Sequence, residues 1–468
     1  MNLKKRLSPF IGDKAFYKAL TAIALPVVLQ NGLTTLVSLL DNIMVGAVGT
    51  EQMTGVSIAN QLMFVFNLCI FGGMGGASIF GAQFFGKKDH EGVRHAFRFK
   101  LLLAGALVLL GVGIFSLFHD PLIASYLHEG GETGDIFATA RYGREYLQIM
   151  LWGFLPFALM QAYASTLREC GETLLPMKAG IAAILVNLVL NYILIFGKLG
   201  LPALGANGAA IATVISRYVE CVIVVFWTHR NKEKMPFIQG AYQSMHIPKE
   251  LTRQIFIKGM PLLINEALWS SGMAMLTQSY STRGLAVVAG LNICSTISNL
   301  FNTVWMANGT AVAIMVGQQL GANQFDEAKR TMKRLLGFSV LSALATTLVL
   351  AVFAPLFPRF YNTTEEVRHI ATGLLLIVAF AAPIHSFVHV SYFTLRSGGK
   401  TWITFLFDCA YMWVVSIPLA RILANHTALA ILPMYAICQY SDIIKAVLGA
   451  ILLKKGVWIH NIVDDTKN

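Results

Sequence analysis

Long stretches without charged residues constrain this chain more than any other feature. Asp, Glu, Lys and Arg are all missing from residues 52–86, 101–119, 284–325 and 335–358. A helix that spans a membrane needs about 20 mostly apolar residues, so each stretch can supply one. Charged residues make up 13% of the chain, against about 25% in an ordinary soluble domain. The composition excludes a soluble enzyme, a disordered protein and a secreted disulfide scaffold, and it indicates an integral membrane protein.

The pattern predicts an all-α polytopic membrane protein with twelve transmembrane helices. Of the 36 Lys and Arg residues, 27 lie in segments that share a side with the two termini, and 7 lie in the opposite loops. Positively charged loops stay in the cytoplasm, so we expect both termini there and the protein in the inner (plasma) membrane. The predicted spans are 19–45, 54–83, 101–119, 145–167, 178–197, 206–228, 255–281, 286–317, 335–357, 370–394, 402–424 and 428–453.

The two halves of the sequence repeat each other. GAQFFG at 81–86 matches VGQQLG at 316–321, and LRECGET at 167–173 matches LRSGGKT at 395–401. An even number of spans per copy makes this a parallel repeat, an architecture typical of transporters that bind substrate between the halves. The predicted organisation is an N-terminal cytoplasmic segment (1–18), an N-lobe (19–228), a cytoplasmic linker (229–254), a C-lobe (255–453) and a cytoplasmic tail (454–468).

Polar residues inside the predicted N-lobe spans are candidates for an ion site, because they are costly in a membrane. Asp41 lies five residues before Gly46, and Asn191 lies six before Gly197 with Asn187 one turn deeper. With Thr213, these groups lie about 8–15 Å below the outer surface. They can form a Na⁺ site or surround a protonatable Asp41. Alternatively, the Asn and Thr side chains only hydrogen-bond neighbouring helices.

The predicted C-lobe carries two more acids inside its spans. Glu266 lies eight residues after Lys258, and Asp408 lies eight after Lys400, which places both about 12 Å from the inner surface. They are candidates for binding a cationic substrate or exchanging a proton, and the alternative is a neutral acid that braces two helices.

Other polar and helix-bending residues have simpler interpretations. Two i,i+3 pairs, Arg217 with Glu220 and Asp442 with Lys445, can neutralise themselves on one helix face or across the lobes. His385 and His389 share a helix face without a third metal ligand, so packing or cavity lining is favoured. Pro26 and Pro261 open corresponding helices and are candidate kinks for gating.

The sequence resembles the multidrug and toxic compound extrusion (MATE) family over about residues 15–455. The motifs that carry the resemblance are Pro26, DNIMVGAVG at 41–49, GAQFFG at 81–86, LRECGET at 167–173, NLVLNYILIFG at 187–197, GANGAAIAT at 205–213, GQQLGAN at 317–323, LRSGGKT at 395–401 and IPLA at 417–420.

The resemblance implies a V-shaped fold of two pseudo-symmetric bundles and export of organic cations and amphipathic drugs by alternating access. The driving force is inward movement of Na⁺ or H⁺, without another cofactor or metal. Asp41, Asn187, Asn191 and Thr213 match the family's coupling site. Some members carry Asp where this chain has Asn191, which makes pure proton coupling less well supported here. Glu266 matches an acid used in another branch, so the motifs do not choose between the lobes.

The implied partners are small cationic drugs and the lipid bilayer, without nucleic acid, and we expect a monomer. The main alternative is a lipid-linked saccharide flippase of the related superfamily. A flippase must hold pyrophosphate, which calls for a cluster of basic residues in the cavity. Inside the predicted spans the basic residues are Arg217 and Lys445, each with an acidic neighbour, so the charge balance favours a cation. Motifs of membrane-embedded enzymes and of channel filters are not apparent.

Overall fold

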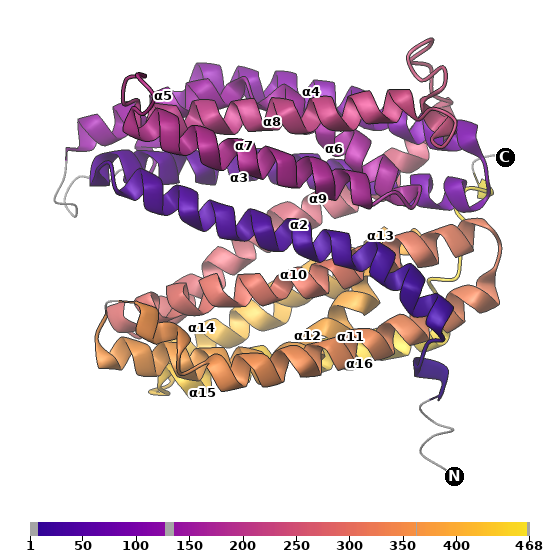
Figure 1. Ribbon diagram of the computed structural model, residues 1–468. Coiled ribbons are helices and arrows are strands. Elements are labelled where there is room, and N and C mark those ends of the chain that lie inside the picture. The colour runs from indigo at the N-terminus through magenta and orange to yellow at the C-terminus, as the bar shows by residue number, and fades with distance from the viewer. Residues whose placement is uncertain (1–7, 127–134, 362, 466–468) are drawn as a thin grey trace. The chain divides into compact units, whose positions relative to one another are not determined.

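The computed structural model describes residues 8–126, 135–361 and 363–465, and these residues form helices and turns without a strand (Figure 1). The predicted terminal segments therefore lie partly outside the described residues. Ten helices are long and apolar enough to cross a membrane, and the bent pair α5 (Ile136–Leu151) and α6 (Phe154–Glu169) forms an eleventh candidate span. The remaining predicted span is α9 (Lys249–Ser281), whose 33 residues extend about 50 Å. The all-α polytopic fold is thus confirmed.

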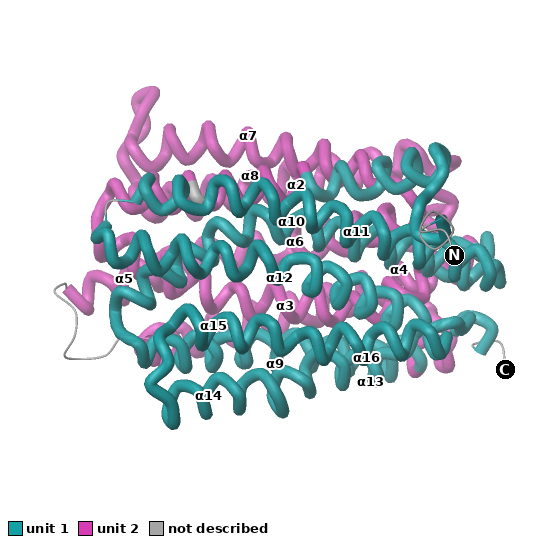
Figure 2. Tube along the Cα trace, turned by 90° about the horizontal axis from the view of Figure 1, so that it is seen from below, with its two compact units in different colours: residues 1–28, 82–89, 254–468 teal, residues 29–81, 90–253 magenta. Residues whose placement is uncertain are grey.

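The described chain divides into two compact units, coloured separately in Figure 2. Unit 2 comprises residues 29–81 and 90–253, and unit 1 comprises residues 1–28, 82–89 and 254–468. The first long helix, α2 (Lys14–Gly46), passes from unit 1 to unit 2 between Val28 and Leu29, two residues after Pro26. The two-lobe organisation drawn from the sequence repeat stays a prediction.

Unit 2 is built mainly from long helices. Its remaining helices are α3 (Thr50–Gly86, up to Gly81), α4 (His90–Ala124), α5, α6, α7 (Leu174–Phe196) and α8 (Gly205–Arg230), followed by the short 3₁₀ helix η2 (Pro236–Ile238). A buried ion pair joins α4 to α6: Lys100 Nζ lies 2.6 Å from Glu169 Oε1 and is fully buried. Buried charges are tolerated when they are paired and hydrogen-bonded, so this pair fixes the two helices together.

The predicted span 145–167 is broken rather than continuous. α5 and α6 meet at an angle of 49° around Trp152 and Gly153. At the break the Gly153 carbonyl accepts from the Phe157 N–H at 3.2 Å and also from Arg217 on α8 through a long bond of 3.5 Å. Pro156, which has no N–H to donate, lies in the first turn of α6, where that loss is harmless.

The predicted linker is folded onto unit 2. Arg98 on α4 donates to the carbonyls of Gly240, Ala241 and His246 at 2.8, 2.9 and 3.2 Å. The Tyr163 hydroxyl on α6 bonds to Tyr242 and lies 3.0 Å from His229 Nε2. Residues 235–246 are therefore an ordered part of this unit.

Unit 1 contains the later helices and a large apolar core, which includes Leu20, Ala311, Leu395 and Trp458, all fully buried. Two predicted spans are interrupted here: 402–424 contains π-helical turns, and 428–453 consists of α15 and α16, which meet at Ser441. The elements are η1 (Ser8–Phe10), α9, α10 (Leu285–Gly321), α11 (Phe325–Phe353), η3 (Phe357–Phe360), α12 (Glu365–Ser397), α13 (Thr401–Phe405), the π-helical turns η4 (Leu406–Ala410) and η5 (Met412–Ser416), α14 (Ile417–His426), α15 (Ile431–Tyr440) and α16 (Asp442–Lys455).

Candidate functional site

Asp41, on the part of α2 that belongs to unit 2, is half-buried and meets polar groups of α7 and α8. Asn191 Nδ2 donates to Asp41 Oδ1 at 2.6 Å and to Asn187 Oδ1 at 3.2 Å. Asn187 Nδ2 donates to Thr213 Oγ1 at 3.3 Å. One chain of hydrogen bonds thus connects the four side chains of the predicted ion site. The sequence grouped these residues because they lie at the same depth in their helices.

The Asn187 and Asn191 side-chain amides beside Asp41 can make hydrogen bonds or ligand contacts beyond those described above. With its oxygen and nitrogen exchanged, the Asn187 amide donates to both Asp41 oxygens at 3.2 and 3.3 Å, and its oxygen accepts from Thr213 at 3.3 Å. Asn191 is fully buried, yet its Oδ1 has no hydrogen-bond partner in the described part of the chain. Carboxylate, amide and hydroxyl oxygens are the ligands that hard cations prefer. This arrangement can therefore accept a cation or a proton at Asp41.

A cavity of about 260 Å³ adjoins this group. Asp41, Asn191, Thr213 and Arg217 lie on its wall, together with five polar residues that the sequence patterns did not indicate. Since each water takes about 30 Å³, the cavity has room for several waters or a hydrated ion. Those five wall residues are Ser38, Asn42, Asn60, Asn67 and Tyr146.

Arg217 shares the cavity with Asp41 but does not neutralise it. Its guanidinium lies over the Phe157 ring, 4.9 Å from the ring centroid, and donates to the Gly153 carbonyl. Among the described residues no ion pair within 4.0 Å joins Arg217 to Asp41 or to Glu220. Arg217 and Glu220 therefore make no direct ion pair, although their charges still attract each other. The guanidinium instead contacts the Gly153 carbonyl and the face of the Phe157 ring.

In unit 1, Asp408 lies in the π-helical turn η4 and is already paired. Lys445 Nζ on α16 lies 2.5 Å from Asp408 Oδ1, and Asn265 Nδ2 on α9 donates to Asp408 Oδ2 at 3.2 Å. The Lys445 and Asp408 side chains are 9% and 18% exposed. From the sequence, Asp408 is a candidate for binding a cationic substrate, and Asp442 is a possible partner of Lys445. In the structure the direct ion pair of Lys445 is with Asp408, because packing brings α16 against η4.

Glu266, one residue after Asn265, makes no hydrogen bond within the described part of the chain and is half-buried. Of the two acids predicted for the C-lobe, Glu266 is the one without an ion pair within 4.0 Å among the described residues. Asp442 lies 3.6 Å from His385 Nε2. His389 packs on Phe393 with ring centroids 4.9 Å apart, and its buried Nε2 has no hydrogen-bond partner in the described structure.

Pro26 and Pro261 both lie inside continuous helices, α2 and α9. In each helix the proline removes one backbone hydrogen bond. Their role in gating stays a prediction.

Comparison with known proteins decides the family. A model of the MatE family matches residues 26–193 and 261–422, more than two thirds of the chain. The chain belongs to the MatE family. This is the family that the motifs suggested, so that prediction is confirmed, and the chain is a multi-pass membrane transporter rather than an enzyme. The two matches begin at Pro26 and Pro261, which are related by the same shift along the chain as GAQFFG and VGQQLG.

Curated relatives cover nearly the whole chain. It is 25% identical over 424 residues to "Probable multidrug resistance protein YoeA" of Bacillus subtilis (90% of this chain, 89% of that protein). It is 25% identical over 450 residues to "Probable multidrug resistance protein NorM" of Thermotoga maritima (94% and 93%).

Solved structures share the fold. One is described as the outward-facing conformation of a multidrug resistance MATE family transporter of the MOP superfamily. It matches with a TM-score of 0.84 and 19% identity, over 98% of this chain and 99% of that one. A MATE in complex with MaL6 matches with a TM-score of 0.83 and 20% identity, over 96% and 98%.

Proposed function

We propose that this transporter exports organic cations and amphipathic drugs in exchange for Na⁺ or H⁺ by alternating access. One observation carries the proposal: the Asp41 carboxylate has no cationic partner within 4.0 Å in the described structure, is surrounded by amide and hydroxyl groups, and opens on a polar cavity. The curated relatives named as multidrug resistance proteins support the substrate class. The excess of basic residues in alternate loops supports a plasma-membrane location with both termini in the cytoplasm.

In this proposal Asp41 binds the coupling cation, with Asn187, Asn191 and Thr213 as the neighbouring ligands. A ligand shifts a conformational equilibrium only by the difference between its affinities for the two states. Cation binding at Asp41 therefore drives export if the amides and hydroxyl close on the ion in one state and separate in the other. Glu266 is the substrate or proton group proposed for the C-lobe. Asp408 has a positioning role there, because Lys445 and Asn265 already occupy its two oxygens.

The experiment that tests this is ethidium efflux from proteoliposomes, with sodium and pH gradients imposed separately. We expect one gradient to drive efflux and so to identify the coupling ion. Asp41→Asn should abolish the gradient-driven component while the protein keeps its wild-type thermal stability in detergent. Asp120→Asn is the matched control, because that carboxylate is 57% exposed and pairs with Arg144. Full gradient-driven efflux by Asp41→Asn would refute the proposed mechanism.

A further inference from the structure

The chain after α16 folds back onto unit 1 instead of extending into solvent. The helix ends at Gly456, whose φ of +68° is in the left-handed region that stops helices. Beyond it, Trp458, Ile462 and Val463 are 0%, 2% and 0% exposed. Trp458 Nε1 donates to the Leu453 carbonyl at 3.2 Å. Residues 458–464, which we call the tail segment, are thus held by burial as well as by polar contacts.

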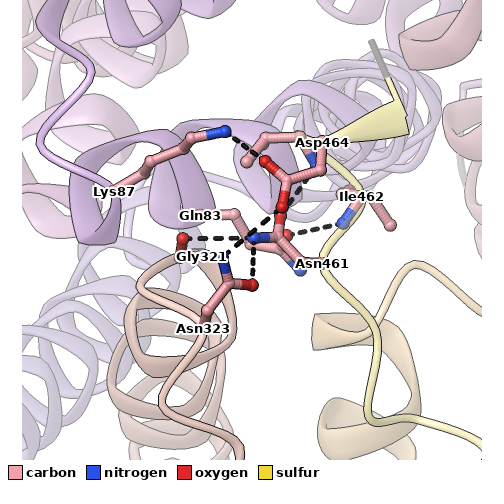
Figure 3. A network of polar contacts seen from close by, with 8 residues as sticks. Gln83, Lys87, Gly321, Asn323, Asn461, Ile462 and Asp464 are labelled. Carbon is pink, nitrogen blue, oxygen red and sulfur yellow. Dashed lines mark hydrogen bonds and ion pairs between the residues drawn. The ribbon is translucent and has the colours of Figure 1, made fainter. Parts of the chain in front are cut away.

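Gln83, near the end of α3, is the principal polar anchor of the tail segment. It is fully buried. Its Nε2 donates to the Ser397 carbonyl at 2.9 Å and to the His460 carbonyl at 3.3 Å. Its Oε1 accepts from the Ile462 N–H at 2.9 Å (Figure 3). The amide thereby connects the end of α3 to the end of α12 and to the tail backbone.

Two further tail residues reach the turn after α10. Asn461 Nδ2 donates to the Gly321 carbonyl at 3.3 Å and to Asn323 Oδ1 at 2.7 Å. Asp464 accepts from Asn323 Nδ2 at 3.4 Å and forms an ion pair with Lys87, just beyond α3 (Figure 3). The tail segment therefore contacts the turn after α3 and the turn after α10 at once.

Those two helix ends also cross each other, and they do so through the repeated motif. A Cβ placed on Gly86 would overlap the Gln318 carbonyl, and a Cβ placed on Gly321 would overlap the Gln83 carbonyl. Gly86 and Gly321 occupy equivalent positions in the two copies of the motif, as do Gln83 and Gln318, so the same contact is made twice. The glycines allow the two backbones to touch, and the tail segment lies over this crossing.

We propose that the tail segment is a clasp that holds the ends of α3 and α10 together and must release before they can separate. This inference rests on the proposed function, because alternating access is what requires the first copy, which contributes α3, to move against the second, which contributes α10. While Gln83, Asn461 and Asp464 keep their partners, separation of the helix ends would leave buried amides and backbone groups unpaired. Such groups are expensive to leave without partners. The clasp therefore favours the state in which this end of the protein is closed.

A reversible crosslink tests whether release is required. Cysteines replace Lys87 and Asp464 in a background in which the six native cysteines are changed to serine or alanine. Oxidation should reduce ethidium efflux from proteoliposomes at least tenfold, and a reductant should restore it. The control pair, Asp326→Cys with Arg330→Cys, joins one turn of α11 and should leave efflux unchanged when oxidised. Undiminished efflux by the fully crosslinked Lys87→Cys/Asp464→Cys protein overturns the clasp.

A second measurement does not depend on transport. Ala82→Cys, 3% exposed beneath the crossing, is labelled with a membrane-impermeant maleimide with and without Asn461→Ala/Asp464→Ala. The double change should raise the labelling rate severalfold, whereas Asp465→Ala should not change it. An unchanged rate counts against the clasp even if efflux is absent. Absent efflux by the wild-type chain under both gradients counts against the proposed function alone.

Discussion

Lys445 Nζ lies 2.5 Å from Asp408 Oδ1, and the two side chains form one buried ion pair. The sequence predicts the two residues in separate membrane spans. The two residues are 37 positions apart, on α16 and in the π-helical turn η4. The carboxylate has a further donor in Asn265. π-helical turns occur frequently at functional sites, and this one holds a neutralised acid beside the free acid Glu266.

Lys445→Met should destabilise the protein strongly, because it leaves the Asp408 carboxylate buried without a counter-charge. Removing one partner of a buried pair costs roughly 3–5 kcal/mol. Thermal unfolding in detergent should show a lowered midpoint, and Lys445→Met/Asp408→Asn should recover most of the loss. Lys329→Met, which breaks an exposed pair with Asp326, is the control and should change stability little. A midpoint equal to the wild type in Lys445→Met would mean that the pair is not a stabilising contact in the membrane protein.

Asn191→Ala should weaken binding of the coupling ion, because it removes the amide nearest to Asp41 and the unpaired oxygen beside it. A loss of about 1.4 kcal/mol corresponds to tenfold in affinity, so the ion concentration for half-maximal ethidium efflux should rise about tenfold. Asn60→Ala alters an exposed wall residue of the same cavity and serves as the control. Equal half-maximal concentrations in the two variants would exclude Asn191 from the ion site.

Gly86→Ala and Gly321→Ala should each destabilise the crossing of α3 with α10. Each added methyl group would overlap a backbone carbonyl, and overpacking of this kind costs about 1–3 kcal/mol. Unfolding midpoints in detergent report the loss. Gly105→Ala, a helical position with no atom within 4 Å of the added Cβ, should be neutral or slightly stabilising. Similar midpoints for all three variants would show that the backbones do not need the glycines.

Arg98→Ala should loosen residues 235–246, because one guanidinium holds three of their carbonyls. Limited proteolysis of the linker should become several times faster. Arg94→Ala removes a single 3.3 Å hydrogen bond to the Phe237 carbonyl among the described residues, and should have a smaller effect. Cleavage of both variants at the wild-type rate would contradict an anchoring role for Arg98.

The sequence predicted the fold class well, because charge-free stretches leave a chain few alternatives to membrane helices. It did not predict the interruption at Gly153, since residues 145–167 are apolar on both sides of it. Gly153 followed by Pro156 was the available signal, because proline belongs in the first turn of a helix. The π-helical turns around Asp408 have no comparable signal, since they depend on packing.

Some contacts of the polar residues could also be predicted from the sequence, and others could not. Depth along each helix grouped Asp41 with Asn187, Asn191 and Thr213, because spacing from a helix end determines depth. Spacing along one helix could not predict the partner of Lys445, since the choice between Asp442 and Asp408 depends on which helices pack together. Only one sequence feature indicated that Asn265 belongs to this polar group, namely its position next to Glu266 inside a predicted span.

The double contact of Gly86 with Gln318 and of Gly321 with Gln83 makes this surface complementary to its own duplicate, as at the interface of a two-fold symmetric dimer. The two glycines therefore constrain each other although they are far apart in the sequence. A side chain added at either one pushes on the backbone that the other one contacts.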